Sequence, residues 1–215
     1  MRRALAALFM LTLAGCATNY VPDSGWEHRL AAWRPDDAAQ FYERWYGGQL
    51  AAMREPSFQD ANAVAGFARR YRLTVLPTFT PGFAARVDQR ADGRAVLHWV
   101  ILDGAGGYDP GTIADRGAVA LTPEQVESLD RAIAAANLPV MVRAEPVDSP
   151  RIDPETGATV MTICVDGTTW LFELASPDRQ AFLTRSCVPD EVALRGLIDV
   201  TYALLPTDSF DDVAD

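Results

Sequence analysis

The residues best suited to chemistry lie in a glycine-rich segment, residues 103–111, with the sequence DGAGGYDPG. A dinucleotide-binding fingerprint would occupy this place after a strand, but Pro110 prevents a following helix from presenting its N-terminus to a phosphate. Carboxylates that suit calcium are present at Asp103, Asp109 and Asp115, yet their spacing matches no EF-hand loop. We expect a structured turn that holds neither cofactor nor metal, and calcium binding is the alternative.

The same turn is the candidate binding surface of the chain. Gly106 and Gly107 permit a positive φ or a close approach of the backbone. Tyr108 and Asp109 follow them directly. We expect these four residues to contact a partner.

The sequence contains no recognisable catalytic motif. No serine lies in a nucleophile-elbow pentapeptide, and the absence of lysine excludes Schiff-base and P-loop chemistry. The only histidines are His28 and His98, so we expect no multi-histidine metal site, and His98 is expected to be a hydrogen-bonded core residue. Neighbouring carboxylates such as Glu124 and Glu127 lie at a helix start, where the helix dipole explains them. An acid pair that only folding assembles is left open.

The N-terminus has the pattern of an export signal. Arg2 and Arg3 precede an apolar run, residues 4–13, that is well short of the ~20 residues a membrane-spanning helix needs. The sequence LAGC, which ends at Cys16, resembles the lipobox of bacterial lipoproteins. The resemblance implies that residues 1–15 are removed and that the Cys16 thiol carries a diacylglyceryl anchor.

The expected location follows from this anchor. We expect the protein in the cell envelope, attached to the membrane through lipid alone. Ala17 follows the cysteine, and the resemblance to the sorting signals of enteric bacteria implies the outer membrane, facing the periplasm. An ordinary secretory signal, in which Cys16 is incidental, is the alternative.

Two further cysteines, Cys164 and Cys187, form an even pair once Cys16 is assigned to lipid. In an oxidising compartment we expect a disulfide between them, which stabilises by about 3–4 kcal/mol on a chain-entropy basis. Free thiols or a two-cysteine metal site are the alternatives, although no histidine lies near either residue.

Composition limits both the partners and the number of domains. The formal net charge of the 215-residue chain is −10 at pH 7, and such a surface repels nucleic-acid phosphates and anionic lipid. The length suits one domain with a sizeable core. We place a lipidated cysteine and tether at residues 16–34, a single domain at 35–205 and an acidic disordered tail at 206–215.

The pattern of elements predicts an α+β fold, with a mainly antiparallel sheet covered by helices. We expect an aromatic-rich helical annex at residues 35–70 and a sheet with two covering helices at residues 71–205. The first annex helix is weakened or ended at Gly47-Gly48, and a second begins at Ser57.

Three strands are predicted in the first half of the sheet, at Leu73–Phe79, Gly82–Gln89 and Arg94–Asp103. Asp92-Gly93 predicts a type I′ turn between the last two. Both alternating sets of the third strand are apolar, so we place that strand centrally in the sheet. A helix from Pro123 to Ala136, with Thr122 as its N-cap, covers one face.

A further hairpin is predicted at Asp166-Gly167, in a register that sets Ile163 opposite Trp170. A returning strand, Gln180–Ser186, would then bring Cys187 to the edge that holds Cys164. The chain must bend inward at Cys187, because a disulfide needs Cα atoms about 4.4–6.8 Å apart. A last helix begins near Pro189.

Several short segments together resemble a family of uncharacterised bacterial exported proteins. They are Tyr71-Arg72-Leu73 with Thr78-Phe79, the turn at 104–111, Leu121-Thr122-Pro123-Glu124-Gln125, and Asp166-Gly167-Thr168-Thr169-Trp170 with Glu173, Arg185 and Pro189. The resemblance covers residues 71–205 and departs from the family at 137–139 and in the added stretch 140–160. It implies the fold and no activity.

These observations lead to one functional expectation and two alternatives. We expect a lipid-anchored, non-enzymatic domain that binds an envelope protein or polymer through its sheet edge, glycine turn or aromatic annex. A hydrolase with a carboxylate site assembled by folding is the first alternative. An inhibitor of another envelope protein is the second.

Overall fold

The computed structural model describes residues 37–58, 64–138, 151–160, 167–187 and 191–206. In chain order the elements are α2 (Asp37–Met53), β1 (Arg69–Leu76), β2 (Phe83–Gln89), β3 (Ala95–Leu102), β4 (Ile113–Ala120), α4 (Pro123–Ala135), β5 (Arg151–Ile152), β6 (Thr159–Val160), β7 (Thr169–Ser176), β8 (Arg179–Ser186) and α5 (Val192–Ala203).

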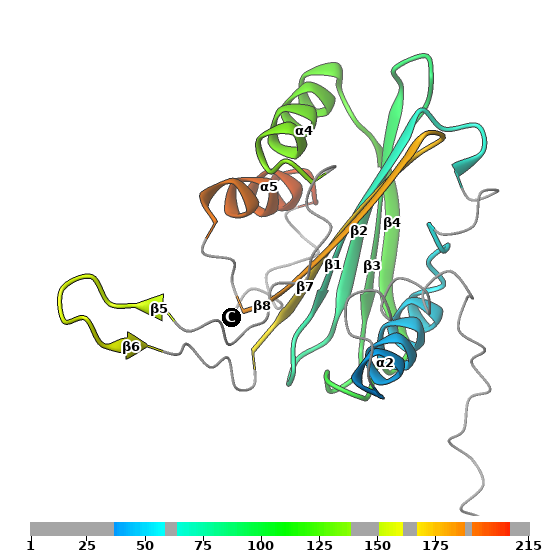
Figure 1. The fold of residues 1–215 in the computed structure, drawn as a ribbon. Helices are drawn as coiled ribbons and strands as arrows, with labels where there is room; N and C mark the ends of the chain where they lie inside the picture. Colours follow the sequence, from blue (N-terminus) through cyan, green and yellow to red (C-terminus); the bar gives the residue numbers. More distant parts are fainter. Residues whose placement is uncertain (1–36, 59–63, 139–150, 161–166, 188–190, 207–215) are drawn as a thin grey trace, which may run out of the picture.

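Six of the strands form one antiparallel sheet in the order β4-β3-β2-β1-β7-β8 (Figure 1). Strand β1 pairs with both β2 and β7, so it joins the meander β1–β4 to the hairpin β7–β8. Strands β5 and β6 form a separate small ribbon that projects from the sheet. The predicted α+β class, an antiparallel sheet with helices, is therefore confirmed.

Helices cover both faces of the sheet, with α4 and α5 on one side and α2 on the other (Figure 1). Apolar and charged residues alternate along β1, so one face of the sheet is apolar and the other carries charges. Tyr71, Leu73 and Val75 belong to the large apolar core that also contains the buried residues of α4 and α5. Arg70 and Arg72 alternate with them and therefore lie on the side of α2.

The two helices on the apolar face follow their sequence signals. At the start of α4, Thr122 and Gln125 form the predicted capping box, and Val126, Leu129 and Ile133 are buried. Helix α5 buries four residues of its inward stripe, Leu194, Leu197, Ile198 and Thr201.

The annex differs from the prediction at its glycine pair. Helix α2 continues through Gly47-Gly48, because Tyr46, Leu50 and Met53 are buried against the sheet. This packing outweighs the cost of about 1 kcal/mol for each glycine inside a helix. The second annex helix, predicted from Ser57, falls largely on residues 59–63, outside the described part of the chain.

The first hairpins are confirmed with three corrections. Strand β1 begins at Arg69 rather than Leu73, since the charged residues before Leu73 pair across the sheet. The Asp92-Gly93 turn is not type I′, because only Gly93 has a positive φ and its N–H donates to Arg90 O at 3.0 Å. Strand β3 lies inside the sheet, but it is next to the edge strand β4 and not at the centre. Strand β4 was not predicted, because most of its residues are exposed.

The predicted hairpin at Asp166-Gly167 is wrong in its register. Trp170 on β7 pairs with Val75 on one side and with Arg185 on the other, so no position opposite it is left for Ile163. The two-residue turn that starts the returning strand lies instead at residues 177–178. The returning strand itself is confirmed as β8.

Candidate functional site

The face of the sheet toward α2 carries charged side chains in register. Glu173, Arg72, Arg86 and His98 occupy directly paired positions on β7, β1, β2 and β3. Directly paired residues point to the same side of a sheet, so these four side chains are neighbours. Two like charges, Arg72 and Arg86, are therefore adjacent and need carboxylates to hold them together.

Two carboxylates neutralise this pair of arginines. Arg72 Nε donates to Glu173 Oε2 at 2.5 Å, and both side chains are almost fully buried. Glu55 Oε2 accepts from Arg72 Nη1 at 3.2 Å and from Arg86 Nε at 2.9 Å. Glu55 thus bridges the two like charges.

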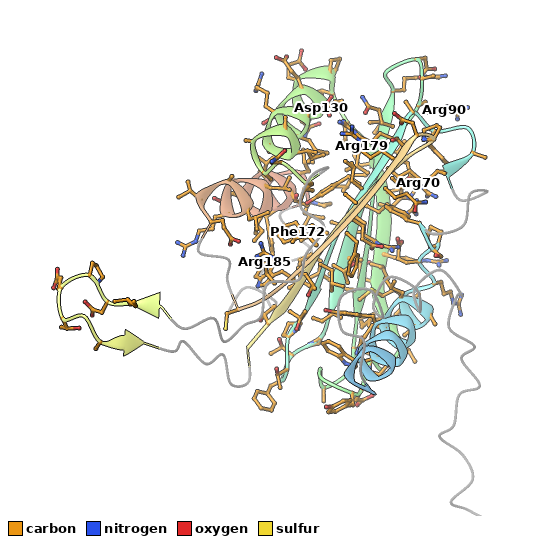
Figure 2. All side chains as sticks on the ribbon, viewed as in Figure 1. Arg70, Arg90, Asp130, Phe172, Arg179 and Arg185 are labelled. Carbon is orange, nitrogen blue, oxygen red and sulfur yellow. The ribbon has the colours of Figure 1, made fainter. Side chains whose placement is uncertain are left out.

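A third carboxylate, Asp88, holds the next pair. Arg70 lies directly opposite it and donates through two nitrogens, at 2.6 and 3.0 Å, while Arg86 also bonds to it. Figure 2 shows Arg70 on the side of the sheet away from Asp130 of α4. We name these three arginines and three carboxylates the buried ion-pair cluster: Glu55, Arg70, Arg72, Arg86, Asp88 and Glu173.

The turn that ends α2 positions Glu55 over the cluster. Glu55 N donates to Leu50 O and Arg54 N to Ala51 O, both at 3.0 Å, which is the Schellman pattern of a helix C-terminus. The pattern needs a left-handed residue, and Arg54 supplies it with a φ of 55°. Glycine usually occupies this position, because a side chain there costs roughly 1–2 kcal/mol.

Two aromatic rings cover the guanidinium groups. The Arg72 guanidinium lies 4.5 Å from the centroid of Phe58, and the Arg70 guanidinium lies 4.6 Å from that of Phe67. A cation over an aromatic face is attracted by the ring quadrupole, and the rings also exclude water. This cover explains how the charges stay buried beside α2.

The charge balance of the cluster limits its chemistry. Burial acts to lower the pKa of Arg72, but Glu173 and Glu55 outweigh it and raise that pKa, so the guanidinium stays charged. The carboxylates in turn accept hydrogen bonds from arginines. A set of paired charges of this kind orients elements and is poorly suited to proton transfer.

His98 lies at the rim of the cluster. Its side chain is 36% exposed, so the expectation of a core histidine is wrong, and its Nε2 is 3.4 Å from Asp88 Oδ2. Burial and then the charge of Arg86 lower the pKa of His98, although Asp88 opposes them. The lowered pKa favours the neutral imidazole over the charged form.

The predicted binding turn holds α2 on the sheet. Gly107 O accepts hydrogen bonds from Gln49 Nε2 at 3.0 Å and from Trp45 Nε1, both on α2. Gly106 has a φ of 84°, and a Cβ there would lie 2.5 Å from Thr80 O. The two glycines thus have the structural task that their positions suggested.

Two loops meet at one end of the sheet, and each carries an exposed aromatic ring. We name residues 77–82 and 103–112 the loop end. Gly107 N donates to Pro77 O at 3.1 Å, which ties the two loops together. Phe79 is 70% exposed and Tyr108 is 79% exposed. The loop end therefore presents two aromatic side chains from one hydrogen-bonded unit.

The three aspartates considered for calcium each accept hydrogen bonds from a different part of the structure. Asp103 accepts from Thr112 N at 2.6 Å and from Thr112 Oγ1 at 3.0 Å, and these bonds lower the pKa of its carboxyl group. Asp109 accepts from the backbone of its own turn, and Asp115 accepts from Trp99 Nε1 at 3.1 Å. Within the described ranges, no three acidic, histidine or cysteine side chains form a group that could hold a metal ion.

A groove of about 560 Å³ lies between the end of α2 and the start of β4. It is lined by Ala51, Ala52, Arg54, Gly111, Thr112, Ile113 and Arg116. Both arginines are exposed, and neither forms an ion pair with a carboxylate of the residues that the structure describes. Sequence reasoning missed this groove, because α2 and β4 are distant in the chain.

The predicted cysteine sites are only partly described. Cys187 is disulfide-bonded and has a φ of 62°, which turns the chain at the end of β8. Cys164 and Cys16 lie outside the described residues, so their pairing and lipidation stay predictions. The tether and nearly all of the acidic tail also lie outside the described residues, so both stay predictions.

Comparison with known protein families and with curated proteins found no match for this chain. The resemblance to exported proteins therefore stays a prediction. In the part of the chain that the structure describes, no helix has the length and apolar character needed to cross a bilayer.

Proposed function

We propose that this chain is a lipid-anchored binding protein of the cell envelope, which holds an envelope protein or polymer at the loop end of its sheet. The leader and the LAGC sequence ending at Cys16 support the anchor, and Ala17 supports the outer membrane, facing the periplasm. The net charge of −10 argues against nucleic acid as the partner. Inhibition of another envelope protein is one form of such binding.

The observation that carries the proposal is the pair of exposed rings, Phe79 and Tyr108, on two loops joined by a backbone hydrogen bond. Aromatic side chains are enriched at interfaces because they bury a large area at a low cost in conformational entropy. The bonds from α2 to Gly107 fix the loop beneath Tyr108. Rigid loops lose little entropy on binding, which raises affinity.

Photo-crosslinking in intact cells tests the proposal. A photoreactive residue is placed at Phe79, at Tyr108 and, as a matched control, at Ile152, which is 74% exposed on β5. We expect a discrete adduct at both loop-end positions and none at the control. No adduct at either aromatic position, or the same adducts at all three, would contradict the proposal.

A second candidate function, hydrolysis, is favoured by the contact between His98 and Asp88. A neutral histidine oriented by a carboxylate is a general base. We rank hydrolysis second, because Asp88 already bonds to Arg70 and Arg86. Turnover of an ester, amide or glycoside that disappears in His98→Gln would support hydrolysis, and turnover unchanged in that variant would exclude His98 as the base.

A further inference from the structure

We propose that the groove between α2 and β4 binds an oxyanion, a carboxylate or phosphate group of a ligand, between Arg54 and Arg116. The inference rests on the proposed function and names the chemical class that the partner presents. Guanidinium groups bind both kinds of oxyanion through paired N–H donors, so the two ligand sources share one recognition chemistry.

The first support is the contrast in how this acidic chain uses its arginines. Arg70, Arg72 and Arg86 are all bonded to carboxylates of the buried ion-pair cluster. Arg54 and Arg116 line one groove and have no such carboxylate in the described ranges. Two guanidinium groups that line one groove, and that form no ion pair with a described carboxylate, favour an anionic ligand there, although the whole molecule has a net charge of −10.

The second support is the position of Arg54 in a left-handed conformation. Folding favours glycine at this helix end, and an arginine that complements the helix dipole recovers only part of the cost. A residue that opposes the local backbone preference indicates a role for its side chain outside the fold.

The third support is the shape of the groove. Its walls include Ala51, Ala52 and Gly111, whose small side chains leave room beside the two guanidinium groups. Two carboxylates lie beside Gly111: Asp103 Oδ1 is 2.3 Å from where a Cβ of Gly111 would be, and Asp109 Oδ1 accepts from Gly111 N at 3.2 Å. Both oxygens of Asp103 accept hydrogen bonds from Thr112. Asp103 and Asp109 thus bond to their own loop, and neither forms an ion pair with Arg54 or Arg116.

Calorimetric titration of the mature full-length chain tests the inference. The probes are inorganic phosphate, the dipeptide N-acetyl-alanyl-alanine with its free carboxylate, and the amide of the same dipeptide as an uncharged control. We expect saturable binding of at least one anion and none of the amide. Binding of phosphate alone or of the dipeptide alone identifies which oxyanion the groove prefers.

Variants locate the binding. Arg54→Gly and Arg116→Gln are each expected to weaken anion binding at least tenfold, and neither should unfold the chain, since glycine suits position 54 and Arg116 is exposed. Arg90→Gln removes the same charge from the β2–β3 loop, at the opposite end of the sheet (Figure 2), and should change nothing. No saturable binding of either anion, equal binding of the amide, or equal affinity in the groove variants would overturn the inference.

The two proposals fail separately. Anion binding by the purified chain without crosslinks at Phe79 and Tyr108 would contradict the proposed function alone. Crosslinks at those positions without anion binding would contradict the oxyanion groove alone.

Discussion

Two regions that meet at the end of α2 use their charges in opposite ways. Glu55 points to the buried ion-pair cluster, where three arginines face three carboxylates. Arg54, the residue before it, lines the groove with Arg116, where the described residues supply no carboxylate partner. Two consecutive residues thus belong to different regions: Glu55 to a cluster with equal numbers of positive and negative side chains, and Arg54 to a groove with two positive ones.

The difference indicates that the cluster stabilises the fold and that the groove binds a ligand. Buried charges are costly to desolvate, so the cluster persists only because each charge has partners, and its effect is to fix where the chain after α2 lies. The groove charges remain in water, so they add little to stability. Changes to the cluster should therefore alter unfolding, and changes to the groove should alter binding.

The largest expected effect is on the cluster. Arg72→Met leaves Glu173 buried without its main counterion and should destabilise the fold by about 3–5 kcal/mol. Urea unfolding followed by circular dichroism measures this change in the free energy of unfolding. Arg72→Met/Glu173→Leu removes both charges and should recover at least half of the loss. A single variant as stable as the parent would show that the pair is not buried.

A smaller loss is expected from the bridging carboxylate. Glu55→Gln keeps the side-chain shape but removes the charge shared by Arg72 and Arg86, and should cost about 1–3 kcal/mol. The same unfolding measurement applies, with Glu127→Gln, on the exposed face of α4, as the matched control. Equal stability of the two variants would remove Glu55 from the cluster.

The pH dependence of stability tests the rim of the cluster. Because burial and Arg86 lower the pKa of His98 below 6.5, the unfolded chain binds its proton more readily. Stability should therefore fall as pH drops below about 6.5. Unfolding at about pH 7.5 and pH 5.5 should show a smaller fall in His98→Gln than in the parent. An equal fall in both would exclude His98 as the cause.

Local signals predicted the parts of the fold whose partners are close in sequence. Thr122 and Gln125 are three residues apart, and their capping box is present in the structure. The hairpin at Asp92-Gly93 is likewise present in the structure. Its turn type was predicted wrongly, because the Asp-Gly pair is compatible with more than one type of turn and only the φ values distinguish them.

Long-range pairing is where sequence reasoning failed. Arg72 and Glu173 are 101 positions apart, and no local pattern joins them. The alternation of Arg70 and Arg72 with Tyr71 and Leu73 is a local signal of a charged face, but the strand was predicted to begin at Leu73 and this signal was missed. The prediction of a hairpin at Asp166-Gly167 was wrong because β7 pairs with the distant β1 and with β8, and the pairing with β1 leaves no local trace in the sequence.

The most direct measurement compares unfolding and anion binding in Arg54→Gly. We expect stability to be unchanged or higher by about 0.5–1 kcal/mol, because glycine relieves the left-handed conformation, while binding of the anion falls at least tenfold. Lower stability with full anion binding would contradict the division between a structural cluster and a binding groove.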